Sequence, residues 1–317
     1  MEAGTTALGR TGRPEAPSLR AARRRFGESV IKGLLVLAAL ISLLTTVGII
    51  FALVEETIVF LREVPVHDFL FGTKWSPLFE PPSFGVFPLV VGTLVTTFWA
   101  LVVCIPFGLG AAIWLSEYAQ PRARRILKPT LEVLAGVPTV VYGFFALTFV
   151  TPLLQDLWFL GEEPQIFNAL SAGLVMGVMI LPTVASLSED AMSAVPGGLR
   201  EGALALGGSR MQVATRVVVP AALSGIVASF VLAISRAVGE TMIVLIAAGN
   251  MPNDSIIPTE AHQTMTGFIG AAGIGDQPTG STGYKTIFAV GATLFVATFV
   301  MNMISIRLVR RYREVYE

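Results

Sequence analysis

The sequence predicts an all-α membrane protein with six transmembrane helices. Hydrophobic residues make up 53% of its 317 residues and charged residues only 14%, whereas a soluble domain carries about 25% charged residues. Several apolar stretches are each about as long as the roughly 20 residues that cross a bilayer as a helix. These stretches are residues 33–54, 86–115, 129–154, 165–187, 217–248 and 286–306.

The stretches differ in how clearly each predicts a span. The first, fourth and sixth carry no charged residue, and the second and fifth are long enough for a span plus an extension. The third is the weakest because it carries Glu132 near one end. Kinks at Pro138 and Pro182 are compatible with close packing through small residues or with the shaping of a pathway, and both interpretations stay open.

Basic residues are distributed unevenly between the two sides of the predicted spans. With both termini inside, the inner segments hold 18 Lys and Arg residues and the outer loops hold three. Lys and Arg collect on the cytoplasmic side of membrane proteins, so both termini are predicted to be cytoplasmic. The net charge of the chain is zero despite this asymmetry, which argues against nucleic acid as a partner. The uneven distribution of basic residues instead indicates that the chain lies in a lipid bilayer.

Two regions are predicted along the chain. Residues 1–25, rich in Gly, Pro and Arg, are predicted to form a disordered cytoplasmic tail. The apolar run after them is too long for a signal peptide, so an uncleaved anchor is expected. Residues 26–317 then form one transmembrane domain. The predicted outer loops are residues 55–85, 155–164 and 250–285.

No catalytic or metal-binding cluster is predicted. An intrachain disulfide is excluded because Cys104, which lies in a predicted span, is the one cysteine of the sequence. His67 and His262 lie in different outer loops, and no acid–nucleophile arrangement accompanies either of them. The sequence is therefore not expected to be that of an enzyme, and a membrane-embedded enzyme is the weakest of the possible functions.

The inner loop between the fourth and fifth stretches predicts a helix–turn–helix elbow. A helix is expected from about 199 to 206, ended by Gly207 and Gly208, which are typical residues past a helix C-terminus. Ser209 and Gln212 have the spacing of a capping box for a second helix. An earlier helical stretch is expected to begin at residues 188–190. On the cytoplasmic side, such an elbow can be bound by another protein.

This elbow resembles the EAA loop of the membrane subunits of bacterial ATP-binding-cassette (ABC) importers. That loop reads Glu-Ala-Ala, three residues, Gly, nine residues and an apolar triplet closed by Pro, and Glu201, Ala203, Gly207 and Pro220 match it. Gly202 replaces the first Ala, which weakens the helix by roughly 1 kcal/mol. The resemblance implies the type I ABC importer permease fold, with Glu201, Ala203 and Gly207 in a coupling helix that docks on the ATPase.

The chain does not carry its own ATPase motif. The phosphate-cradling pattern G-x-x-x-x-G-K-[ST] is absent from the sequence. A separate ATPase is therefore expected to bind ATP and Mg²⁺, and no cofactor is expected in this chain.

The fifth stretch contains an Arg and a Glu inside the membrane. Arg236 and Glu240 are spaced i, i+4, which places them on one face of a helix and predicts an ion pair. An Arg near mid-membrane costs roughly 2.5–3.5 kcal/mol on insertion scales and usually faces a bundle interior or a water-filled path. The pair is either structural or an anion station, because the planar guanidinium suits a tetrahedral oxyanion.

Two segments narrow the resemblance. Residues 236–241 (Arg-Ala-Val-Gly-Glu-Thr) and 136–143 (Gly-Val-Pro-Thr-Val-Val-Tyr-Gly) look like the permeases of bacterial phosphate-specific importers. The resemblance is to the PstC-type permease, with supporting segments at 69–72, 88–94, 115–118 and 310–316, and it covers about residues 26–317. It implies a location in the bacterial cytoplasmic membrane and inorganic phosphate as substrate, with Arg236 and Glu240 in the translocation path. The implied partners are a second homologous permease (PstA-like), a dimeric ATPase subunit (PstB-like) and an extracytoplasmic phosphate-binding protein (PstS-like).

Other functions remain open from the residues themselves. A permease for another oxyanion, such as sulfate or molybdate, would have the same elbow. A secondary anion transporter would explain the membrane-embedded charges but not the elbow.

Overall fold

The computed structural model describes residues 26–77, 79–159, 161–275 and 277–311. The predicted tail, residues 1–25, lies outside the described residues. The chain divides into one unit that ends at Phe51 and a second that begins at Ala52, and the helix α1 (Phe26–Glu63) crosses this boundary. The contacts and sites described below all lie in the second unit.

Helices of the length and composition of membrane spans overlap each predicted stretch, although the third and fifth have other bounds than predicted. Five single helices qualify, and a bent pair makes up to six if it counts as one span. The five are Glu28–Glu63, Phe87–Tyr118, Thr139–Leu157, Ala169–Ser193 and Thr282–Arg307. The pair joins Arg210–Ala221 to Leu223–Val238 at a bend of 73°. The helical architecture with five to six apolar helices is thus confirmed.

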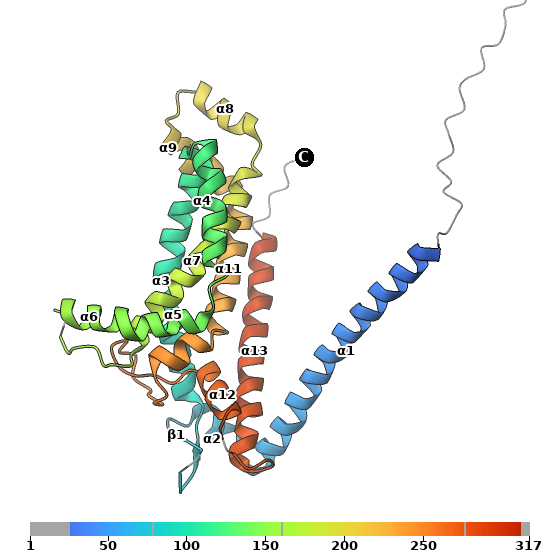
Figure 1. The fold of residues 1–317 in the computed structure, drawn as a ribbon, viewed down its shortest axis with the longest axis vertical. Coiled ribbons are helices and arrows are strands. Elements are labelled where there is room, and N and C mark those ends of the chain that lie inside the picture. Colours follow the sequence, from blue (N-terminus) through green and yellow to red (C-terminus); the bar gives the residue numbers. More distant parts are fainter. Residues whose placement is uncertain (1–25, 78, 160, 276, 312–317) are drawn as a thin grey trace, which may run out of the picture. The chain divides into compact units, whose positions relative to one another are not determined.

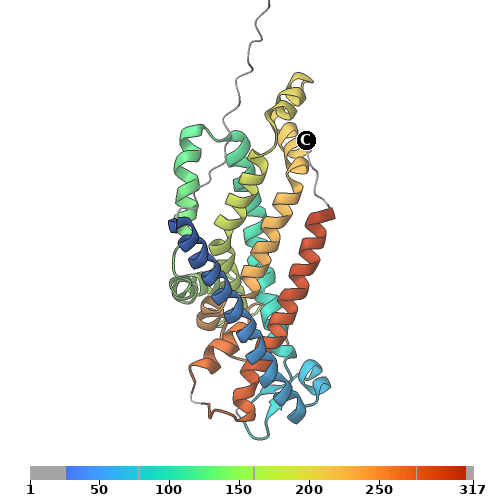
Figure 2. The same ribbon diagram turned by 90° about the vertical axis from the view of Figure 1, so that its right-hand side faces the viewer.

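The helices α3 (Phe87–Ile113) and α7 (Ala169–Ser193) form the packed centre of the second unit. Glycines allow this contact, because a Cβ on Gly173 would lie 2.9 Å from the carbonyl oxygen of Thr96, and one on Gly177 would lie 2.7 Å from that of Ala100. The helices α11 (Leu223–Val238) and α13 (Thr282–Arg311) run side by side in both views (Figure 1, Figure 2). Close packing through small residues is therefore present at the core.

The third predicted span is divided in the structure. The helix α4 (Pro121–Leu134) ends before Pro138, and a second segment follows from α5 (Thr139–Phe145) through a π-helical turn, η2 (Ala146–Val150), to α6 (Thr151–Leu157). Figure 1 shows α5 and α6 lying across the direction of α3 and α7. A continuous span over 129–154 was the wrong expectation. Pro138 has no N–H and disfavours helical geometry in the residue before it, so the helix restarts there.

The fifth predicted span is also interrupted. It begins with α9 (Arg210–Val213), the π-helical turn η3 (Ala214–Val218) and α10 (Val219–Ala221), and it continues through α11. The α-helix ends at Val238, and a further π-helical turn, η4, covers Val244–Ala248. The break between α11 and η4 contains Glu240, which decides the geometry of the predicted membrane charges.

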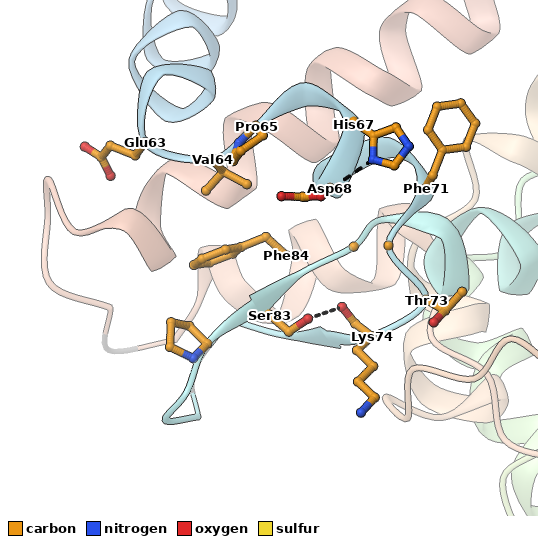
Figure 3. Close-up of a pocket in the computed structure, with 13 residues that line it drawn as sticks. Glu63, Val64, Pro65, His67, Asp68, Phe71, Thr73, Lys74, Ser83 and Phe84 are labelled. Carbon is orange, nitrogen blue, oxygen red and sulfur yellow. Dashed lines mark hydrogen bonds and ion pairs between the residues drawn. The ribbon is translucent and has the colours of Figure 1, made fainter.

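The first predicted outer loop contains regular structure. The helix α2 (Val66–Phe71) precedes two short antiparallel strands, β1 (Trp75–Ser76) and β2 (Ser83–Phe84). Trp75 packs edge-on against Phe268 of α12 (Met265–Gly273), with ring centroids 4.8 Å apart. Figure 3 shows the adjoining pocket, a cavity of about 520 Å³ whose lining includes Asp68 and Lys74. Its lining carries both signs of charge, so it favours no single kind of ion.

Candidate functional site

The predicted elbow is formed by α8 (Gly197–Ala205) and α9. At the end of α8, Gly207 has φ +84°, the Gly207 N–H donates to the Leu204 carbonyl at 2.9 Å, and the Gly208 N–H donates to the Ala203 carbonyl at 3.1 Å. These two bonds make a Schellman motif, which needs a residue with positive φ at the position of Gly207. The helix end predicted from the two glycines is confirmed.

The second arm of the elbow is capped as predicted. The Gln212 N–H donates to Ser209 Oγ at 3.3 Å, and the Ser209 N–H donates to Gln212 Oε1 at 2.8 Å. Both halves of the capping box are therefore present. The elbow is held by its own backbone and capping bonds, so its shape does not depend on a partner.

The elbow presents an exposed face with an apolar tip. Leu206 is 92% exposed, and Glu201 and Gly207 are also exposed, whereas Ala203 is half-buried against an apolar cluster that includes Val213. Figure 1 shows α8 at the end of the second unit opposite β1 and α12. Leu199 and Leu204 of α8 are exposed as well, so the elbow carries several apolar side chains that a partner protein is able to cover.

Arg200, which precedes Glu201 on α8, contacts the ends of two spans. Its guanidinium donates to the carboxylate of Glu117 in the π-helical turn η1 (Trp114–Tyr118) that extends α3. It also donates to the backbone carbonyls of Val195 and Met192 at 2.6 and 2.7 Å. The sequence did not predict this contact, because Glu117 and Arg200 are 83 positions apart.

The C-terminal end of α7 carries a second set of polar and charged side chains, here called the α7 cluster: Arg124, Lys128, Glu189, Asp190 and Ser193. The fully buried Glu189 carboxylate pairs with Arg124 and with Lys128 Nζ at 2.7 Å, and it accepts a hydrogen bond from Ser193 Oγ at 2.7 Å. Lys128 also pairs with Asp190. The expectation that residues 188–190 begin a new helix is wrong, because α7 runs unbroken to Ser193.

The pairing in the α7 cluster changes the ionisation of Lys128. Burial alone would lower the pKa of this ammonium, but its hydrogen bonds to Asp190 and Glu189 outweigh that effect and raise the pKa above its ordinary value of 10.5. The cluster therefore keeps Lys128 charged at every physiological pH, and it fastens α4 to α7.

The charges of the fifth span, Arg236 and Glu240, are here called the α11 charges. Arg236 lies in the last turn of α11 and is half-buried. Its Nη1 donates to Thr183 Oγ1 of α7 at 3.0 Å. Within the described part of the chain, no carboxylate lies within 4.0 Å of the Arg236 side chain.

Glu240 lies in the break after α11 and is 8% exposed. Its Oε1 accepts hydrogen bonds from the backbone N–H groups of Met242 at 3.1 Å and Ile243 at 3.3 Å, so it caps the next helical segment. Its own carbonyl accepts a hydrogen bond from Thr266 Oγ1 at 2.6 Å. These bonds fix the position of the carboxylate independently of Arg236.

The predicted Arg236–Glu240 ion pair is absent from the described residues, and this is a correction. The i, i+4 rule holds only within a continuous helix, whereas α11 ends at Val238, with Gly239 as its C-terminal cap. The structure thus brings Arg236 to Thr183 and Glu240 to backbone amides. It places Glu201, Ala203 and Gly207 together on the separate elbow.

Comparison with known proteins identifies the family. The model of the "Binding-protein-dependent transport system inner membrane component" family matches residues 104–314. A probable ABC transporter permease, YqgH of Bacillus subtilis, is 34% identical and covers 75% of each chain. The phosphate transport system permease PstC of Pasteurella multocida is 33% identical over 78% of this chain and 81% of the relative.

The solved structures support the same fold. A bacterial alginate ABC transporter, solved with an alginate-bound periplasmic protein, has a chain that aligns with a TM-score of 0.61 at 15% identity, covering 90% of this chain and 98% of that one. At this identity the likeness shows the fold alone. On its sequence relatives and its fold, the chain belongs to the inner membrane components of binding-protein-dependent transport systems and, within them, to the PstC-type ABC permeases.

Proposed function

We propose that this chain is the membrane permease of an ATP-driven importer of inorganic phosphate. The similarity to relatives named as phosphate permeases, at 33% identity over 78% of the chain, is the observation that carries the proposal. The α11 charges give it a physical basis. A half-buried guanidinium bonded to one neutral hydroxyl keeps donors available for an oxyanion.

Phosphate is distinguished from sulfate by its remaining proton. Near neutral pH, phosphate carries at least one O–H, and an ionised carboxylate is able to accept a hydrogen bond from it but only repels sulfate. Glu240 Oε1 is bound by two backbone amides, whereas Oε2 makes no hydrogen bond with the described residues. Oε2 is thus the oxygen that we assign to this contact, with Arg236 balancing the charge.

The permease requires partners for energy and for substrate capture. We infer a second homologous permease (PstA-like), a dimeric ATPase subunit (PstB-like) and an extracytoplasmic phosphate-binding protein (PstS-like). The elbow, with Glu201, Ala203, Leu206 and Gly207, would dock on the ATPase, and the end with α2 and α12 would meet the binding protein. This assigns the chain to the bacterial cytoplasmic membrane with both termini inside, and it assigns ATP and Mg²⁺ to the ATPase rather than to this chain.

The test is radiolabelled phosphate uptake in cells that lack this chain and are supplied with it or with Arg236→Lys. We expect the unchanged chain to restore uptake. Arg236→Lys should lower uptake by at least about tenfold, because a lysine point charge does not reproduce the planar fork. Arg307→Lys, which changes an exposed arginine of α13, is the matched control and should restore uptake fully.

Two competing functions give different results in the same system. A sulfate or molybdate permease would leave phosphate uptake unrestored and would restore uptake of labelled sulfate or molybdate instead. A secondary transporter would move phosphate in vesicles of the purified chain without nucleotide or partners. Loss of the assembled complex in Arg236→Lys would show that Arg236 supports the structure rather than the anion.

A further inference from the structure

The polar attachment of α8 to the spans depends on one side chain, Arg200. No residue of α8 is fully buried, and all the side-chain hydrogen bonds that α8 makes within the described residues come from Arg200. Its apolar attachment is limited to partly buried residues such as Ala203. A force on the elbow would therefore reach the spans through Arg200, through the apolar contact of Ala203 and through the chain connections.

Arg200 binds Glu117 in a forked arrangement. Nε lies 3.2 and 3.4 Å from the two carboxylate oxygens, and Nη2 lies 3.1 Å from Oε1. The two side chains are 22% and 10% exposed, so solvent screens this pair less than an ordinary surface pair. The fork fixes direction as well as distance, which is what the transmission of a movement requires.

The remaining donors of Arg200 bind the C-terminal end of α7. Met192 lies in the last turn of α7, where carbonyls lack a partner within the helix, and its carbonyl accepts from both Arg200 and the Val195 N–H. Val195 follows two residues after the end of α7. A cation is also favoured there by the helix dipole. One guanidinium thus joins α8 to the extension of α3 and to the end of α7.

The helix α7 leads from this contact to the proposed anion site. It is continuous from Ala169 to Ser193 and carries Thr183, the hydrogen-bond partner of Arg236. Thr183 lies about 15 Å from the end of α7 at a rise of 1.5 Å per residue. The α7 cluster binds the same end of α7 to α4. The end of α7 is therefore held from two sides, and Arg200 provides the side that faces the elbow.

We propose that Arg200, held by Glu117, is the positioning residue that transmits the movement of the coupling helix α8 to α3 and α7. This rests on the proposed function, in which an ATPase moves α8. Arg200 acts through the spans and touches neither phosphate nor nucleotide. Without the fork, ATP hydrolysis would move α8 while α7 and Thr183 follow only in part.

The experiment uses the complete importer in vesicles, with this chain, the second permease, the ATPase and the binding protein. Phosphate uptake and ATP hydrolysis stimulated by the phosphate-loaded binding protein are measured on the same vesicles. For Arg200→Lys we expect the phosphate transported per ATP to fall at least about fivefold, the lower end of typical coupling between sites. The ATPase should still co-purify in full amount.

Two further variants separate transmission from a general structural role. Glu117→Gln keeps an acceptor and the side-chain shape but loses the charge, and it should lower the same ratio. Combined with Arg200→Lys, it should add little, because both changes remove one interaction. Arg307→Lys, which changes an exposed arginine of α13 outside the elbow, should leave the ratio unchanged.

The outcomes are distinct. An unchanged ratio in both Arg200→Lys and Glu117→Gln would overturn the proposal, and so would a proportional loss of uptake and hydrolysis with release of the ATPase. If Arg200→Lys does not fold, Glu117→Gln decides. If the unchanged importer hydrolyses ATP but moves no phosphate, the proposed substrate fails. The inference about Arg200 is then tested with the anion that stimulates hydrolysis.

Discussion

The α7 cluster and the α11 charges place ionised groups in an apolar protein in opposite ways. In the α7 cluster, the buried Glu189 is matched by two cations and a hydroxyl. Among the α11 charges, Arg236 has one neutral partner among the residues that the structure describes, and Glu240 is held by backbone amides. Where charges pair with each other they fasten helices, and where they stay apart their remaining donors and acceptors are open to a ligand.

The largest effect is expected from removing the centre of the α7 cluster. Glu189→Ala leaves Arg124 and Lys128 without their shared buried partner, which should lower the stability by about 3–5 kcal/mol. Thermal unfolding of the purified protein in detergent measures this. Asp190→Ala is the matched control, since its side chain is 57% exposed, and it should cost at most about 1 kcal/mol. Equal losses in the two variants would refute the structural role of Glu189.

A smaller effect, on selectivity rather than stability, is expected at Glu240. In Glu240→Gln the amide oxygen still accepts from Met242 and Ile243, so the fold should persist. The uncharged amide nitrogen would then take the place of Oε2. The phosphate O–H would lose a hydrogen bond to a charged acceptor, which contributes about 1.5–3 kcal/mol. Competition between labelled phosphate and unlabelled sulfate should shift towards sulfate by about tenfold or more. Unchanged phosphate uptake with unchanged rejection of sulfate would rule out this role.

The elbow gives the next effect in size. Gly207→Ala forces a Cβ into a residue with φ +84°, which should cost about 1–2 kcal/mol and loosen the end of α8. Hydrogen exchange of the α8 amides measures the change. Gly202→Ala is the matched control, because it lies within the helix with no atom within 4 Å of its added Cβ. It should slow exchange, since Ala favours a helix over Gly by about 0.5–1 kcal/mol. Equal behaviour of the two variants would contradict the αL cap.

The smallest effect concerns pH. Because the pKa of Lys128 is raised above 10.5, the stability that its ion pairs contribute is fully present below that ordinary value, and it is lost only as the pH rises through the higher value of the folded protein. The difference in stability between the unchanged protein and Lys128→Met should therefore stay constant between about pH 6 and pH 9. Thermal unfolding across this range checks it. A difference that disappears near neutral pH would contradict the pairing.

The sequence predicted what depends on local rules. The end of α8 at Gly207 and the capping box at Ser209 follow from residues within a few positions of one another, and both are confirmed. The ion pair of Arg236 and Glu240 failed because it assumed a continuous helix, and the end of α11 at Gly239 was not recognised. That single glycine changes which groups each charge is able to reach.

The remaining contacts depend on tertiary structure. Lys128 and Glu189 are 61 positions apart, and Arg200 and Glu117 are 83 apart, so no periodicity connects them. Lys128 pairs with two acids on α7 rather than with Glu132, which lies four positions along its own helix α4. The sequence predicted a kink at Pro138, but it did not predict that the helix ends before Pro138 and that the next segment runs in another direction.

One paired measurement tests the distinction between the two regions most directly. Glu189→Gln and Arg236→Gln are compared for thermal unfolding of the purified importer and for labelled phosphate uptake by the same preparations. The account predicts that Glu189→Gln unfolds at a clearly lower temperature, whereas Arg236→Gln unfolds like the unchanged protein and transports little or no phosphate. An Arg236→Gln importer that is as unstable as Glu189→Gln, or one that transports phosphate normally, would contradict it.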